Sequence, residues 1–148
     1  MNRIAILCCA AVLAGCAKSG EKSPEQFPAD HPPLSLAEVA GRWSMKTMNE
    51  TKDSTLITFE LGATADTSGW TFNFPGRPPV PVRVSVSGNA VVLDAGPYAS
   101  VLRKGVQVTT HGAYHLEGGK LVGTTIVHYA TTAADSVRRL PAEGTKLP

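Results

Sequence analysis

Cysteine is scarce in this sequence and confined to its beginning. The 148 residues contain three cysteines, Cys8, Cys9 and Cys16, and none follows position 16. The long remainder of the chain therefore has no thiol for a disulfide, for a metal site or for a nucleophile. A fold formed by these residues depends on its packed core alone.

A strong charge of either sign is also missing. Fourteen lysines and arginines stand against 12 acidic residues, which gives a formal net charge of +2. No basic run is interleaved with aromatic residues, and no glycine-rich phosphate loop precedes a helical pattern. We therefore expect no nucleic-acid partner and no cofactor.

The apolar run at the start of the chain is too short to span a membrane. It covers Ile4–Leu13 and follows Arg3, whereas a transmembrane helix needs about 20 apolar residues. A positive residue followed by such a run is typical of a secretory signal peptide. The run ends in Leu13-Ala14-Gly15-Cys16, which resembles the lipobox of bacterial lipoproteins.

This resemblance implies cleavage before Cys16, so that residues 1–15 form the signal peptide. Cys16 would then carry a diacylglycerol on its sulfur and an acyl chain such as palmitate on its amine. Two or more chains anchor a protein stably, whereas one chain does so only marginally. In this family an aspartate after the cysteine favours the inner membrane. Ala17 stands here, which implies a membrane anchor in the outer membrane of the cell envelope, facing the periplasm.

The chain after Cys16 divides into a tether and one domain. Residues 16–34 are rich in proline and charge and lack apolar periodicity, which predicts a flexible tether. Residues 35–148 suffice for a single domain. Ser35 stands three residues before Glu38 in a capping-box pattern, which predicts one short helical turn. Beyond Gly41, alternating valines and threonines between turn residues predict β structure.

Two hairpins can be aligned from the sequence. A turn at Gly88-Asn89 pairs Val86 with Val91, Val84 with Leu93 and Arg83 with Asp94. A turn at Gly118-Gly119 pairs Leu116 with Leu121, Tyr114 with Gly123, Gly112 with Thr125 and Thr110 with Val127. The side chains expected to face inward are Trp43, Met45, Thr47, Ile57, Phe59, Leu61, Trp70, Phe72, Phe74, Val80, Val82, Val84, Val86, Val106, Val108, Leu116, Val127 and Tyr129.

A final strand near residues 136–140 brings the total to about eight. Pro81 has no amide donor, so its strand should border a sheet edge or a gap. The predicted fold class is all-β: an antiparallel meander of about eight strands forming an open or split barrel. The proline-rich loop Pro75–Pro79 is expected at one rim.

Three histidines are candidate metal ligands. His111 and His115 would share one face of a helix, but a strand separates them by roughly 13 Å. The hairpin alignment places His111 diagonal to His128, on the face that carries polar side chains. We expect solvated histidines and no metal site.

Two other segments suggest catalysis only weakly. Asp66-Thr67-Ser68-Gly69 resembles the aspartic-protease signature but has an extra residue, and a turn in which Asp66 accepts amide hydrogens explains it. Asp135-Ser136 near His128 leaves a serine triad open, because triads are defined by geometry. We expect that the protein is not an enzyme.

A short helix leading into Gly41-Arg42-Trp43 resembles the opening motif of lipocalins and the wider calycin group. The resemblance implies a lipocalin-like barrel in which Gly41 lets the chain enter closely and Trp43 packs across the closed end. In that family an arginine of the last strand covers the tryptophan. Arg138 or Arg139 would take this role, and we assign it to Arg139.

Two functions remain open. The uncharged inner face suggests a module that binds a small apolar ligand among Phe59, Phe72, Tyr114 and Tyr129, with Pro75–Pro79 as the gate. The same face would also suit a solidly packed barrel. The alternative is a module for protein–protein interaction in the bacterial envelope, such as an inhibitor, acting through exposed loops or an edge strand.

Overall fold

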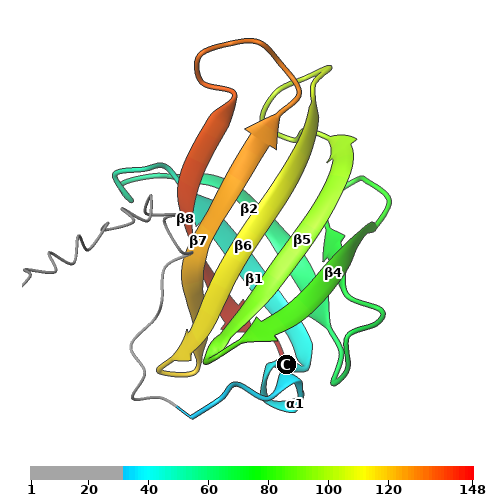
Figure 1. Cartoon of the computed structure of the whole chain (residues 1–148), viewed down its shortest axis with the longest axis vertical. Coiled ribbons are helices and arrows are strands. Elements are labelled where there is room, and N and C mark those ends of the chain that lie inside the picture. The colour runs from blue at the N-terminus through cyan, green and yellow to red at the C-terminus, as the bar shows by residue number, and fades with distance from the viewer. Residues whose placement is uncertain (1–31) are drawn as a thin grey trace, which may run out of the picture.

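The structure is a computed structural model that describes residues 32–148. The predicted signal peptide, Cys16 and most of the predicted tether lie outside these residues. The elements, in chain order, are α1 (Leu36–Val39), β1 (Gly41–Met48), β2 (Thr55–Ala63), β3 (Thr71–Asn73), β4 (Val80–Ser87), β5 (Ala90–Ala99), β6 (Gln107–Glu117), β7 (Lys120–Tyr129) and β8 (Val137–Lys146) (Figure 1). No helix in this part of the chain has the length and apolarity needed to cross a membrane.

The predicted helical turn is confirmed. The Ser35 hydroxyl accepts a hydrogen bond from the Ala37 amide over 3.3 Å, and the Ser35 amide donates to the Glu38 carboxylate over 2.9 Å. These reciprocal bonds satisfy amides that a helix start leaves unpaired. Leu34 already joins the domain, because its amide donates to the Gly88 carbonyl over 3.1 Å.

Eight antiparallel strands follow one another around the barrel, which confirms the predicted meander. Both hairpin registers are confirmed as well: Val86 lies opposite Val91 and Arg83 opposite Asp94, while Tyr114 lies opposite Gly123. A one-residue slip would turn every side chain to the other face of the sheet. The correct register therefore fixes which residues line the interior.

The barrel is closed, where the sequence favoured an open or split one. Pairing of β1 with β8 completes the ring, from Trp43 opposite Lys146 to Thr47 opposite Ala142. The two neighbouring strands with the fewest paired residues lie where Pro81 predicted a gap. There β3 and β4 share only two register pairs, Thr71 with Pro81 and Phe72 with Val80. The Val82 amide extends this junction by donating to the Trp70 carbonyl over 2.9 Å.

Most of the side chains predicted to face inward are buried. The buried ones among them are Trp43, Met45, Thr47, Phe59, Leu61, Trp70, Phe72, Phe74, Val82, Val108, Val127 and Tyr129. Val86 is the clear exception, because it is exposed near the end of β4, beyond the short β3 that flanks this strand. The alternation of apolar residues thus identifies the interior wherever a strand has neighbours on both sides.

The last strand is longer than predicted. We expected it near residues 136–140, and β8 runs to Lys146. Pro141 sits within it, opposite Thr124 of β7. A proline usually interrupts a strand, which is why the sequence suggested an earlier end.

Candidate functional site

Two tryptophans and α1 seal one end of the barrel, which we call the closed end. The Trp43 indole is fully buried, and its Nε1 donates to the Val39 carbonyl over 2.7 Å. The Trp70 Nε1 donates over 2.7 Å to the Asp66 carbonyl, in the turn before β3. Each buried indole thus has a partner for its one polar atom.

Gly41 begins β1 in a conformation that suits glycine. Its φ is +129°, and a Cβ added there would lie 3.0 Å from Cε of Lys146. The Lys146 ammonium lies 5.4 Å from the centre of the Trp43 ring and donates to the Glu38 carbonyl over 3.4 Å. This distance is within the range of a cation–π contact.

The cation beside Trp43 is therefore Lys146, whereas the sequence predicted Arg139 in this role. The β1–β8 register ends at Thr47 opposite Ala142, three residues short of Arg139. Arg139 lies opposite Ile126 of β7 instead. The assignment failed because β8 continues past Pro141 and brings a later residue to the closed end.

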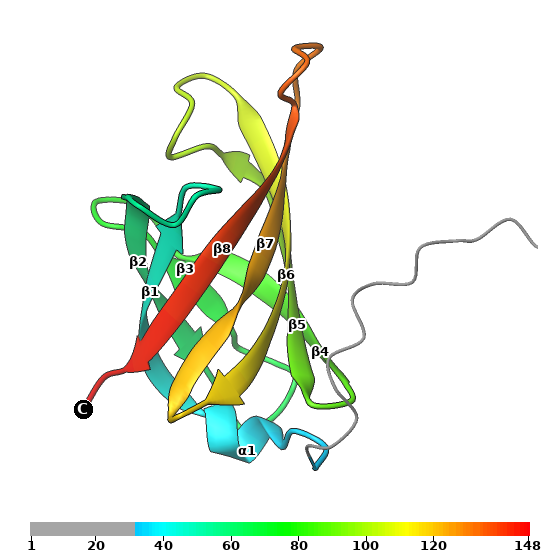
Figure 2. The same ribbon diagram turned by 90° about the vertical axis from the view of Figure 1, so that its left-hand side faces the viewer.

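The opposite end of the barrel, which we call the mouth, carries four loops. They are residues 49–54, 74–79, 100–106 and 130–136, because alternate connections of an antiparallel meander lie at the same end. The loops after β5 and β7 project farthest at this end, while α1 lies at the other (Figures 1 and 2).

An interior cavity of about 60 Å³ lies under the mouth. Phe59, Phe72, Tyr114 and Tyr129, the four residues predicted to contact a ligand, all line it. The rest of its wall consists of Thr47, Ile57, Phe74, Tyr98, Ser100, Val101, Leu102, Val108, Thr110, Thr125, Val127 and Leu140. Within the described part of the chain, this wall contains no acidic or basic side chain.

The cavity is small for a ligand site. A water molecule occupies about 30 Å³ in the liquid, whereas sites for drug-sized molecules measure roughly 300 Å³ or more. The interior in this conformation therefore has room for only a few water molecules. A larger molecule enters only if part of the wall moves.

One side of the cavity is a cluster of aromatic rings in mutual contact. The centre of the Phe59 ring lies 5.1 Å from that of Phe72 and 5.0 Å from that of Phe74. Phe74 in turn stacks on Tyr98 at 5.7 Å. These contacts join β2, β3 and β5 and make this side rigid.

Tyrosines supply hydroxyl groups to the same cavity. Tyr114 is fully buried, its hydroxyl is hydrogen-bonded to that of Thr125, and burial raises its pKa to about 12. Burial also raises the pKa of Tyr98. The hydroxyl of Tyr129 is buried without a hydrogen-bond partner among residues 32–148. A molecule inside the cavity would reach this hydroxyl only after the wall around it moved.

The loop 100–106 covers the cavity, and we call it the lid. Val101 and Leu102 line the cavity from above. Within the lid, the Ser100 amide donates to the Val106 carbonyl over 2.8 Å, and the Arg103 amide donates to the Ser100 hydroxyl over 2.9 Å. Short local bonds thus give the lid its shape.

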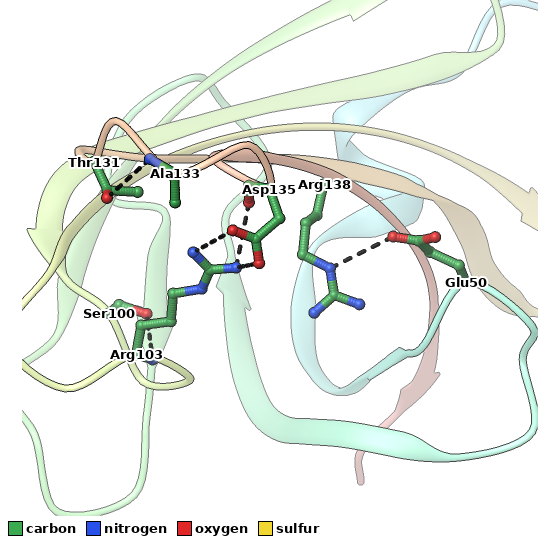
Figure 3. Close-up of polar contacts among 7 residues, drawn as sticks. All are labelled: Glu50, Ser100, Arg103, Thr131, Ala133, Asp135 and Arg138. Atoms are coloured by element: carbon green, nitrogen blue, oxygen red, sulfur yellow. Dashed lines mark hydrogen bonds and ion pairs between the residues drawn. The ribbon is translucent and has the colours of Figure 1, made fainter.

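Arg103 fastens the lid to its neighbours. Its guanidinium lies 4.0 Å from the centre of the Tyr129 ring. It also forms an ion pair with Asp135 of the loop 130–136 and donates to the Asp135 carbonyl over 3.2 Å (Figure 3). Hydrogen bonds from Arg103 lower the pKa of Asp135, so its carboxylate stays charged at neutral pH.

A second arginine stands beside this pair. Arg138 at the start of β8 points toward the loop 49–54, where its Nε lies 3.4 Å from Glu50 (Figure 3). Its charge also contributes to the lowered pKa of Asp135. Arginine–carboxylate pairs therefore join the lid to the loop 130–136 and the start of β8 to the loop 49–54.

The loop that borders the cavity differs from the expected one. Among Pro75–Pro79, no residue lines the cavity, and the lid takes that place. Arg77 of this segment supports the lid from outside by donating to the Ala99 carbonyl over 2.7 Å and the Ser100 carbonyl over 3.3 Å. The proline segment instead borders an outer groove of about 650 Å³, lined by Phe74, Arg77, Pro78, Pro79, Val80, Pro81, Arg83, Asp94, Gly96, Pro97, Tyr98 and Ala99.

The histidines lie outside this cavity. His111 Nδ1 is 2.7 Å from the Asp94 carboxylate, His115 Nε2 is 3.3 Å from Glu117, and His128 is exposed. Asp94 thus pairs with His111, although Arg83 also lies opposite it as predicted. In residues 32–148 no group of three His, Cys, Asp or Glu side chains is placed to hold a metal ion.

The segments that suggested catalysis have structural partners. Asp66 accepts hydrogen bonds of 2.7 Å from the amide and the hydroxyl of Ser68, which confirms the predicted turn. The Asp135 carboxylate, considered for a serine triad, is paired with Arg103.

No match was found in comparisons with protein families, with curated proteins and with solved structures. The function is therefore inferred from the geometry of this chain.

The lid and Tyr98 were not identified from the sequence as parts of the site. The pairing register of β5 shifts between Ala95 and Tyr98. This shift interrupts the alternation from which the inward or outward direction of a side chain is predicted. The lid has no periodic pattern. Its one signal is the apolar pair Val101-Leu102 inside a turn segment that ends in Gly105.

Proposed function

We propose that this protein is a lipid-anchored lipoprotein of the bacterial cell envelope whose lipocalin-like barrel binds a small, largely apolar ligand at its mouth. The cavity under the lid is the observation that carries the proposal. Its wall combines aromatic and aliphatic side chains with few polar atoms, among them the buried hydroxyl of Tyr129, for which the described chain supplies no hydrogen-bond partner. An apolar pocket with few polar groups is typical of small-molecule sites.

Binding requires the lid to move. The cavity of about 60 Å³ admits only very small molecules, and the lid contributes Ser100, Val101 and Leu102 to its wall. The Arg103–Asp135 ion pair that holds the lid is partly exposed, and exposed ion pairs contribute little to stability. Lid opening is therefore the low-energy way to enlarge the site.

The proposed role is non-catalytic. The titratable side chains in the cavity wall are tyrosines, and the raised pKa values of Tyr98 and Tyr114 keep both hydroxyls protonated at neutral pH. Protonated hydroxyls orient a ligand through hydrogen bonds but do not serve as bases. The polar groups of the wall thus suit recognition.

The anchor rests on the sequence Leu13-Ala14-Gly15-Cys16 and on Ala17 after it. In this proposal Cys16 carries the lipid and the outer membrane holds the protein, with the barrel in the periplasm. The short α1, Gly41 and Trp43 support the lipocalin-like assignment, since they close one end of the barrel and leave the other to loops.

A fluorescence titration tests ligand binding. The probe is N-phenyl-1-naphthylamine, added to the unlipidated chain from Ala17 onward. We expect saturable binding that Val108→Phe abolishes, because Val108 lines the cavity and a larger ring fills it. The matched control is Val86→Phe on the exposed end of β4, which should bind as wild type does. Equal binding by both variants, with folding verified by circular dichroism, would refute an interior site.

The outer groove favours a second candidate, a protein-interaction or inhibitor module. Its 650 Å³ and its four prolines, 78, 79, 81 and 97, offer an apolar surface between Arg77 and Arg83. Proline-rich surfaces are rigid, so contact with a partner orders little additional chain. A photoreactive residue placed at position 79 of the groove tests this candidate by cross-linking in intact envelopes. If no cross-linked protein is recovered, the candidate is contradicted.

A further inference from the structure

Exposed apolar side chains gather at the mouth. Four large hydrophobic residues in the described chain are more than a third exposed: Val86, Val101, Leu102 and Val137, at 42%, 37%, 38% and 53%. Three of them belong to the mouth, two in the lid and one at the first residue of β8. Scattered exposed residues are normal, but here two belong to the lid and one to the strand end that follows the loop 130–136. These two loops project farthest from the barrel (Figure 2).

Positive charge surrounds these residues. The four mouth loops together with Arg138 contain five cations, Lys52, Arg77, Arg103, Lys104 and Arg138, against three carboxylates, Glu50, Asp53 and Asp135. Within residues 32–148, no carboxylate forms an ion pair with Lys52, Arg77 or Lys104, whereas Arg103 and Arg138 are paired. The mouth therefore has uncompensated positive charge beside its exposed apolar tips.

We propose that the mouth docks on the surface of an anionic lipid bilayer. Val101, Leu102 and Val137 would enter the boundary between headgroups and acyl chains, and Lys104 would lie at the phosphates. Apolar tips flanked by lysine and arginine bind such surfaces because burial and charge attraction act together. A protein partner would require a larger surface of complementary shape, whereas the mouth exposes only three large apolar side chains of the described chain, Val101, Leu102 and Val137.

Docking on a bilayer would favour an open lid. Val101 and Leu102 line the cavity and are also exposed, so lipid contact would compete with their contacts in the cavity wall. An apolar ligand could then pass between bilayer and barrel without crossing water. Docking itself does not require the proposed ligand, and the two are measured separately.

The proposed anchor is compatible with this orientation. The chain enters the domain at the closed end, where Leu34 binds Gly88, so the mouth points away from the entry point. The longest strand, β6, has 11 residues and spans at most about 36 Å. The segment 16–33 would reach about 56 Å if extended as a proline-rich chain. Both the lipid and the mouth can therefore contact one membrane.

Co-sedimentation with vesicles tests the proposal. The unlipidated chain from Ala17 onward contains the complete barrel, and the vesicles are phosphatidylethanolamine with or without phosphatidylglycerol. We expect binding to the anionic vesicles that salt weakens. Val101→Ser with Leu102→Ser should reduce partitioning by about tenfold or more, and Lys104→Gln by roughly fivefold.

Two control variants test whether vesicle binding depends on residues of the mouth or on any exposed valine or lysine. Val86→Ser removes an equally exposed valine near the closed end, and Lys46→Gln removes one exposed cation from β1. Both should bind vesicles as wild type does. Docking at the mouth is refuted if wild type does not bind, if neutral vesicles bind equally well, or if the controls lose as much binding as the mouth variants.

A fluorescence measurement reports the contact directly. Trp43 and Trp70 are buried at the closed end, so brominated lipids should leave their emission unchanged. With Leu102→Trp, we expect brominated lipids to quench the added emission, and with Val86→Trp we expect no quenching. Equal quenching of both, or of neither, would overturn the proposal. Titration of the naphthylamine probe without vesicles tests the ligand site independently.

Discussion

Gly112 determines the position of Tyr114 at the base of the cavity. A Cβ added at Gly112 would lie 2.5 Å from Cε2, 2.7 Å from Oη and 2.9 Å from Cζ of Tyr114. The ring thus lies over the glycine, two residues away along the inner face of β6. Gly112→Ala would force the ring away from this position and from its hydrogen bond with Thr125.

Two effects of opposite sign determine how Gly112→Ala changes the free energy of unfolding. Alanine restricts the unfolded chain and favours a strand interior over glycine by roughly 0.5–1 kcal/mol. Overpacking of a buried site costs about 1–3 kcal/mol, and a lost hydrogen bond costs about 1 kcal/mol more. Because Tyr114 is fully buried, the ring has little space to move into. We therefore expect a net destabilisation of about 2 kcal/mol.

Urea unfolding monitored by circular dichroism measures this change. Tyr114→Leu provides the matched background, because without the ring an alanine at position 112 has nothing to displace. The double variant should recover most of the cost of Gly112→Ala, which appears as a coupling free energy between the two positions. If Gly112→Ala stabilises the protein, or costs the same in both backgrounds, the ring does not depend on the glycine.

Three further outcomes are expected. Trp43→Phe should lower the free energy of unfolding by about 2 kcal/mol, because it leaves the buried Val39 carbonyl without its hydrogen bond. Trp70→Phe should lower it less, because the carbonyl that accepts from Trp70, on Asp66, lies in an exposed turn. Equal losses for the two variants would contradict this reasoning. The pKa of Asp135 is lowered below its usual 3.8, so its stabilising contact with Arg103 persists at neutral pH and is lost as the pH falls below that value. The protection of the amides in residues 100–106, measured relative to their intrinsic exchange rate at each pH, should then fall at acid pH in wild type, whereas in Asp135→Asn it should be low at every pH. Cys16→Ala should leave an unprocessed precursor on immunoblots, and normal maturation would exclude the lipobox.

Short-range pattern predicted the scaffold of the site. Val86 opposite Val91 and Tyr114 opposite Gly123 followed from glycine turns and a period of two, which are local properties of the chain. The same pattern placed Phe59, Phe72, Tyr114 and Tyr129 on the inner face, and the structure brings these four to one cavity. The face of the sheet on which a side chain lies can thus be predicted wherever strand pairing is regular.

Contacts between distant segments could not be predicted in this way. Lys146 reaches Trp43 only because β8 continues through Pro141, and proline is a local signal for the opposite result. Arg103 meets Asp135 because two loops far apart in the sequence lie at the same end of the barrel. Such pairs depend on the closed ring of strands, which no single segment encodes.

Ligand mapping by nuclear magnetic resonance tests the central proposal most directly. The unlipidated, isotope-labelled chain is titrated with N-phenyl-1-naphthylamine, and amide shifts are followed for the cavity, the lid and the outer groove. We expect saturable shifts at Thr110, Val127 and Tyr129 and throughout residues 100–106. Shifts confined to residues 78–81 and 97 would place binding in the outer groove and contradict a ligand site inside the barrel, as would the absence of any saturable shift.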